Sequence, residues 1–179
     1  MIPFRRQSSE TIVADFDDNE RLFLSDLAAQ LVEVLEAEGT DPAVERLLPQ
    51  AYPNDPSASA EFRRFTADSL TARKVEHAKT VISSLRRAED DEDFFELDQA
   101  EVQSWLRTLT DLRLTLAVRL EIDNQNEEGR TDDEAEPLQT VYFWLGGLQE
   151  SLLSALLAAD AWASGDPEAD DPEAGDPEA

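Results

Sequence analysis

The stretch VQSWLRTLTDLRLTLAVRL, residues 102–120, decides the fold class. Its large apolar side chains recur every three or four residues, a spacing that places them on one face of an α-helix. They are Val102, Trp105, Leu106, Leu109, Leu112, Leu116 and Leu120. Asp98 lies shortly before this stretch, and Glu101 lies three residues after Asp98. This spacing is that of the capping box that starts many helices. The sequence therefore predicts a long amphipathic helix that begins near Asp98.

Similar spacing of apolar residues predicts three more long helices and one short helix. The long helices are expected over residues 18–38, 58–88 and 137–163, and the short one over residues 42–48. Leu153 and Leu157 widen the apolar face of the last long helix. We therefore expect that helix to be the most buried.

The two ends of the chain differ from this helical pattern. The N-terminal arm, Ile2 to Phe16, alternates weakly and is compatible with a short β-hairpin. The C-terminal tail repeats Asp-Pro-Glu-Ala and has no apolar side chain larger than alanine, which predicts disorder. The expected fold is an all-α four-helix bundle with a short N-terminal arm, in a domain of residues 1–164. An acidic, disordered tail of residues 165–179 follows it.

The charge of the chain excludes several classes of partner. Its 41 acidic and 15 basic residues give a formal net charge of −26. Such a charge repels nucleic acid and anionic membranes, so we expect no direct binding to either. No apolar segment follows Arg5 and Arg6, and no stretch approaches 18 apolar residues. A signal peptide and a membrane span are therefore not expected, and a cytoplasmic location is predicted.

The residues that carry enzymatic or metal chemistry are sparse. The chain has no cysteine, and its one histidine, His77, is expected on the surface. No phosphate-binding loop, hydrolase motif or zinc-protease motif is present. Asp123 to Glu134 imitates a calcium loop, but Glu128 stands where such loops require glycine. We predict that the chain is not an enzyme and has no catalytic, cofactor or metal site.

Basic residues gather in two of the predicted helices. Residues 61–87 hold seven basic and three acidic residues, and Arg107, Arg113 and Arg119 follow in the next helix. Thirteen of the fifteen basic residues are arginine, the side chain best suited to pairing with carboxylates. These arginines form either ordinary surface ion pairs or a docking surface for an acidic or helical segment of another protein.

The hypothesis of a docking surface names specific residues. Tyr142, Phe143 and Trp144 are adjacent, so at least one of Phe143 and Trp144 is expected to be exposed. The candidate partner-binding residues are Arg63, Arg64, Arg73, Lys74, Arg113, Arg119 and Trp144. The wide apolar face of residues 137–163 also makes a homodimer a hypothesis.

Several segments resemble an actinobacterial family of formerly unknown function that includes the oxidative-stress regulator AosR. The resemblance covers about residues 2–160. Its motifs are Phe4-Arg5-Arg6, Phe62-Arg63-Arg64, Arg73-Lys74, the stretch from Trp105 to Leu120 and VYFWLGGLQESL at residues 141–152. The resemblance implies a cytoplasmic transcription regulator that acts through a stress-response sigma factor and promotes cysteine-biosynthesis genes. It implies no catalytic residue. Redox sensing through cysteine cannot operate in this chain, so either the partner senses the stress or this member acts differently.

Two hypotheses of function follow. In the first, the protein regulates transcription by contact with another protein, a sigma factor or RNA polymerase. In the second, it is an acidic decoy that mimics nucleic acid and binds a basic protein. Three segments motivate the second hypothesis, because each holds eight acidic residues: 89–101, 121–136 and 160–178.

Overall fold

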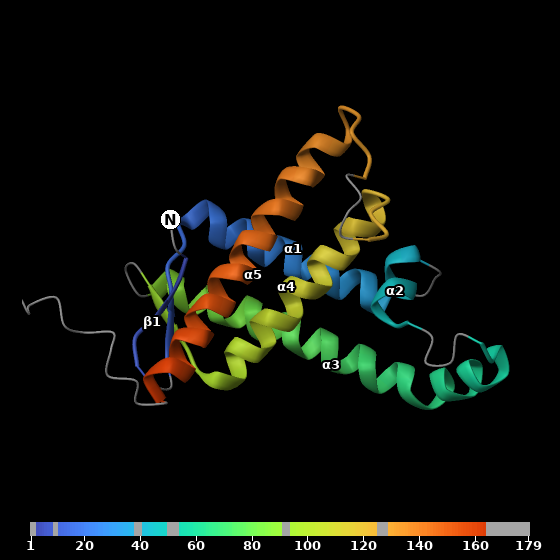
Figure 1. The fold of residues 1–179 in the computed structure, drawn as a ribbon, viewed down its shortest axis with the longest axis horizontal. Coiled ribbons are helices and arrows are strands. Elements are labelled where there is room, and N and C mark those ends of the chain that lie inside the picture. Colours follow the sequence, from blue (N-terminus) through green and yellow to red (C-terminus); the bar gives the residue numbers. More distant parts are fainter. Residues whose placement is uncertain are drawn as a thin grey trace, which may run out of the picture.

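In a computed structural model, the described residues form four long helices, one short helix and three short strands (Figure 1). The structure describes residues 3–8, 11–37, 41–49, 54–90, 94–124 and 129–163. The helices are α1 (Asp18–Glu36), α2 (Pro42–Leu47), α3 (Pro56–Asp90), α4 (Gln99–Arg119) and α5 (Ala135–Ala163), and the strands are β1 (Phe4–Arg6), β2 (Ile12–Ala14) and β3 (Phe95–Leu97). The predictions of a mostly helical fold and an N-terminal hairpin are confirmed. The predicted tail lies outside the described residues, so its disorder and the domain boundary stay predictions.

Side-chain caps explain where α1 and α4 begin. The Asp17 carboxylate accepts a hydrogen bond from the Glu20 backbone N–H at 2.9 Å, and Glu20 accepts one from Asp17 at 3.1 Å. Asp98 and Glu101 form the same capping box at the start of α4, as predicted. Loss of such a cap costs about 1 kcal/mol.

Helix α4 lies at the centre of the molecule, between α3 and α5 (Figure 1), and also contacts α1, α2 and β3. Trp105 is fully buried on α4, and its indole N–H donates a hydrogen bond of 2.9 Å to Ser84 Oγ on α3. Rings from the strand region surround this indole, with centroids 5.4 to 6.1 Å away: Phe4, Phe16 and Phe95. The N-terminal arm is therefore part of the core.

The three strands form an antiparallel sheet in the order β1-β2-β3. Phe4 lies opposite Ala14, and Ile12 lies opposite Leu97. The sequence did not predict β3, because three residues are too few to show an alternating pattern. Its pairing partner, β2, lies about 80 residues earlier in the chain, which shows that tertiary contact creates this strand.

The prediction that the last long helix is the most buried is wrong. Leu145, Leu148 and Leu152 of α5 are buried, but Leu153 is 44% exposed and Leu157 is 68% exposed. The reason is position: α5 packs mainly on α4 and β1, so it has neighbours on one side. Residues 135–158 are also long and apolar enough to span a membrane, although helices of globular proteins share that composition.

Candidate protein-docking groove

A surface groove of about 980 Å³ is lined by residues of α2, α3 and α4. We call it the arginine groove, because its lining includes Arg46, Arg73 and Arg107. Lys74 also lines it, together with three carboxylates: Glu76, Glu101 and Asp111. Apolar side chains also line it, among them Leu106, Leu114 and the partly exposed Leu70. A site with apolar contacts and a few convergent charged groups is typical of protein recognition.

Lys74 is held inside the groove by a buried carboxylate. Its ammonium nitrogen lies 2.7 Å from Asp111 Oδ1, and Asp111 is only 4% exposed. Burial raises the pKa of Asp111, because desolvation of the carboxylate outweighs its hydrogen bond from Lys74. The pair connects α3 to α4, so Lys74 already has a carboxylate partner within the chain.

His77 is half-buried beside this pair, whereas the sequence predicted a surface position. Its Nδ1 lies 3.1 Å from Ser104 Oγ, and that hydroxyl donates to the Ala100 carbonyl at 3.0 Å. Burial, and then the nearby charge of Arg107, lower the pKa of His77 and so favour the neutral imidazole. The Ser104 side chain, which is only 6% exposed, therefore has hydrogen-bond partners in both α3 and α4.

Arg73 and Arg107 differ from the other bases of the groove. Both are exposed, and neither forms an ion pair with any residue that the structure describes. Arg46, by contrast, lies 3.7 Å from the Asp123 carboxylate. In a chain with 41 acidic residues, two arginines without a carboxylate partner on one groove are the groups that another protein could engage.

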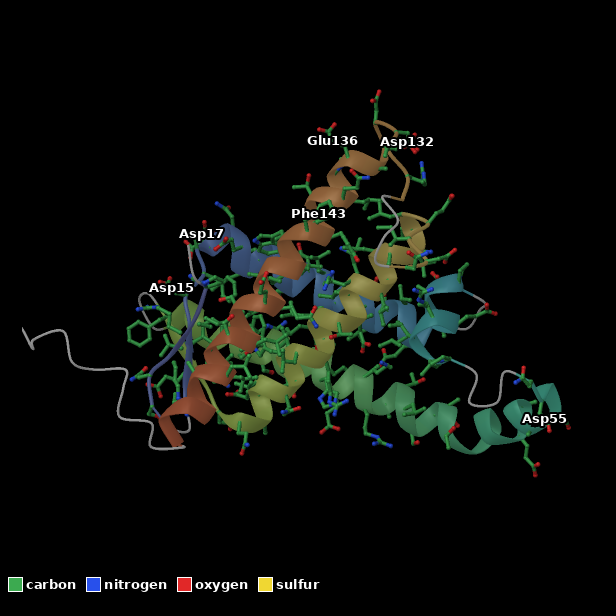
Figure 2. The ribbon with its side chains drawn as sticks, in the orientation of Figure 1. Asp15, Asp17, Asp55, Asp132, Glu136 and Phe143 are labelled. Atoms are coloured by element: carbon green, nitrogen blue, oxygen red, sulfur yellow. The ribbon has the colours of Figure 1, made fainter. Side chains whose placement is uncertain are left out.

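Three other predicted partner-binding residues, Arg113, Arg119 and Trp144, do not line this groove. Arg119 pairs with Asp41 at 2.6 Å, and this hydrogen bond lowers the pKa of Asp41. Arg113 faces α5, where it donates a 2.8 Å hydrogen bond to Gln149. Trp144 is half-buried, with its ring centroid 5.8 Å from that of Phe23. Phe143, which is labelled on α5 in Figure 2, is 70% exposed by its accessible surface, so the expectation of an exposed aromatic residue is confirmed.

Arg63 and Arg64 lie on α3, but their side chains are outside what the structure describes. Sequence reasoning did not select Arg46 and Arg107 as site residues. The sequence did offer a signal for Arg107, because this base lies four residues before Asp111 on the same predicted helix. No local signal could have found Arg46, because only the packing of α2 against α4 brings it to the groove.

The described residues lack the arrangement that a metal site needs. Among the described residues, no group of three or more His, Asp or Glu side chains is arranged to hold a metal ion. Gln125 and Glu127, two positions of the calcium-like loop, lie outside the described residues.

A helical domain with a small antiparallel sheet and a surface groove lined by several arginines defines the class of this protein. The chain belongs to the family described as domain of unknown function DUF2017, which matches residues 1–156. It is 34% identical over 131 residues to a protein of Mycobacterium leprae (strain TN) named "Putative oxidative stress regulator AosR". The match covers 66% of this chain and 59% of that relative's length. No solved structure matches the chain. The predicted family membership is confirmed.

Proposed function

We propose that this chain is a non-enzymatic regulator that binds another protein through the arginine groove. The observation that carries the proposal is the pair of exposed arginines, Arg73 and Arg107, which have no carboxylate partner among the described residues. A planar guanidinium pairs well with a carboxylate, and leucines beside it add apolar contact. The partner would therefore present acidic side chains next to apolar ones, as on an amphipathic helix.

The name of the relative supports a regulatory role in the response to oxidative stress. We propose a cytoplasmic protein partner that belongs to the transcription machinery, either a stress-response sigma factor or a component of RNA polymerase. By family resemblance, the genes controlled would include those of cysteine biosynthesis. Since this chain has no cysteine, the oxidative signal would reach it through the partner.

Binding by Arg73 and Arg107 would be electrostatic at the rim of the groove. Affinity should therefore fall as salt is raised from low to physiological ionic strength, because exposed charges are then screened.

The test is capture of partner proteins from the cytosol of an actinobacterial cell, with and without oxidant, followed by calorimetry with the purified sigma factor or polymerase component. Arg73→Glu with Arg107→Glu should weaken binding about tenfold or more. Arg86→Glu is the matched control, because Arg86 is exposed on α3 but does not line the groove. Equal affinity of the double variant and the wild type would contradict the proposal.

The net charge of −26 motivates the acidic decoy as a second candidate function. A decoy would bind a basic protein through its acidic segments. Deletion of residues 165–179 with neutralisation of Glu89 to Asp93 would then abolish binding, while reversal of Arg73 and Arg107 would not weaken it. The same calorimetric experiment separates the two functions, since the groove proposal requires the opposite pattern.

A further inference from the structure

Helix α5 leaves an apolar stripe uncovered. We call it the outer stripe and define it as Phe143, Gly147, Glu150, Leu153 and Leu157, all of which are exposed. Their spacing of three or four residues places them along one side of the helix. Large apolar side chains that are exposed together, rather than scattered, mark a contact surface.

The open space beside Gly147 is a second feature of this stripe. A Cβ added at Gly147 would meet no atom within 4 Å, whereas one at Gly146 would lie 3.5 Å from the Arg113 guanidinium. Glycine inside a helix costs about 1 kcal/mol relative to alanine. No contact with a described residue accounts for that cost at Gly147, but close approach of another backbone would.

The charge distribution indicates which molecule can cover the outer stripe. From Pro137 to Ala158, the only charged residue is Glu150, in a chain whose net charge is −26. Two copies of such a chain repel one another over most of their surfaces, so a face with little charge is where they can approach. Glu150 lines two grooves beside α5. Arg5, Arg6 and Glu20 line one, and Arg113 lines the other, so guanidinium groups lie in both grooves beside Glu150. Arg5 also lies 3.7 Å from Asp15, and Arg113 donates to Gln149.

We propose that two copies of this chain pair through the outer stripe, antiparallel about a twofold axis at Glu150. The sequence of the stripe is symmetric about that position. Phe143 and Leu157 each lie seven residues from Glu150, and Gly147 and Leu153 each lie three residues from it. An antiparallel pair therefore packs Phe143 on the second copy's Leu157, and Leu153 over the second copy's Gly147.

The size of the stripe indicates a weak dimer. From Phe143 to Leu157 the helix extends about 21 Å, at about 1.5 Å per residue. One helix pair of that length lies at the small end of specific interfaces, so a dissociation constant on the order of micromolar is expected. Because the arginine groove lies on α2, α3 and α4, this pairing and the proposed docking function can fail independently.

Analytical ultracentrifugation of the full chain, from about 1 to 200 μM, tests the pairing. The wild type should shift from the monomer mass of 20.0 kDa toward twice that value. Phe143→Glu with Leu157→Glu should weaken the association about 100-fold, because both side chains are lost from a small apolar interface. Both side chains are about 70% exposed, so the monomer should fold normally, which circular dichroism checks.

Phe94→Glu is the matched control. Phe94 is 50% exposed beside β3, at the opposite edge of the sheet from the strand that contacts α5, and this change should leave association unaltered. A wild type that stays monomeric at the highest concentration, or a double variant that associates as the wild type does, would overturn the proposal.

Cysteine cross-linking tests the orientation, and the natural chain offers no competing thiol. Disulfides require Cα atoms within about 7 Å of each other. Glu150→Cys lies on the proposed axis and should cross-link with itself upon oxidation. Leu157→Cys should not, because its two copies would be about 21 Å apart along the helices. A mixture of Phe143→Cys and Leu157→Cys chains should cross-link with each other. Efficient self-cross-linking of Leu157→Cys would indicate a parallel pair and contradict the proposed axis.

Discussion

Helices α4 and α5 have similar rows of leucine, but α4 is buried to a much greater extent than α5. Helix α4 is buried on several sides and includes even polar residues in the interior: Ser104, Thr108 and Asp111. Helix α5 is the more apolar of the two, yet it leaves Phe143 and Leu157 about 70% exposed. Five neighbouring elements enclose α4, whereas α5 packs mainly on α4 and β1. Burial here follows the position of a helix in the fold and not its hydrophobicity.

The comparison also explains the two candidate surfaces. Polar groups that α4 carries into the interior need partners, and Lys74 from α3 provides one for Asp111. Bases that surround this pair form the arginine groove. The unpartnered side of α5 instead carries apolar side chains, which favour contact with another molecule of low charge. One central helix and one peripheral helix thus produce two chemically different surfaces.

The largest predicted difference between α4 and α5 comes from removal of one aromatic ring on each. Trp105→Ala should lower the free energy of unfolding by about 3–5 kcal/mol, because it leaves a cavity among three phenyl rings and removes the hydrogen bond to Ser84. Phe143→Ala should change it by less than about 0.5 kcal/mol in the monomer, because that ring is mostly exposed. Urea denaturation at micromolar concentration measures both. Similar losses would show that α5 is as integrated as α4.

A smaller effect is predicted at the two adjacent glycines of α5. Gly147→Ala should stabilise the monomer by about 1 kcal/mol, because the methyl group meets open space and alanine favours the helix. Gly146→Ala should gain less, since its methyl group would contact the Arg113 guanidinium and shield that charge from water. Thermal unfolding at low protein concentration compares the two variants. Loss of stability in Gly147→Ala would mean that the helix is constrained there by contacts other than those described.

The smallest effect is predicted at the buried carboxylate of α4. Asp111→Asn should alter stability by less than about 1 kcal/mol at pH 7, because a neutral isostere avoids the cost of burying a charge while Lys74 can turn to water. The pKa of Asp111 is raised in the native state, so the folded protein holds this proton more tightly than the unfolded chain. Its stabilising contribution is therefore complete below the unfolded pKa of about 3.9 and is lost as the pH rises through the folded pKa.

Urea denaturation of the wild type and Asp111→Asn from about pH 4.5 to 7.5 measures this dependence. The wild type should lose stability relative to the variant as the pH rises. Asp41→Asn is a control that should show no such loss in this range, because the hydrogen bond from Arg119 lowers the pKa of Asp41. The contribution of Asp41 is present above the unfolded pKa and is lost only as the pH falls through the folded value. A pH-independent difference between the wild type and Asp111→Asn would show that burial does not raise the pKa of Asp111.

Much of the local structure could be predicted because its causes are local. Helical spacing located α4, and the carboxylates of Asp98 and Glu101 fixed where it begins. Arg73 and Lys74 were predicted as site residues because helix α3 holds a local excess of bases. The sequence could not show that Lys74 has a carboxylate partner while Arg73 stays exposed. The partner, Asp111, lies 37 residues further along the chain than Lys74.

The sequence alone determined the helical elements, the starts of α1 and α4, the absence of thiol chemistry and the family, because propensity, capping, composition and motif order are properties of neighbouring residues. Tertiary structure decided that Phe95 to Leu97 form a strand, that Arg107 joins Arg73 at one groove and that α5 keeps an apolar side exposed. The physical reason is that burial, strand pairing and ion pairing depend on which distant segments meet. A periodic pattern identifies the apolar face of a helix, but only packing determines how much of that face is covered.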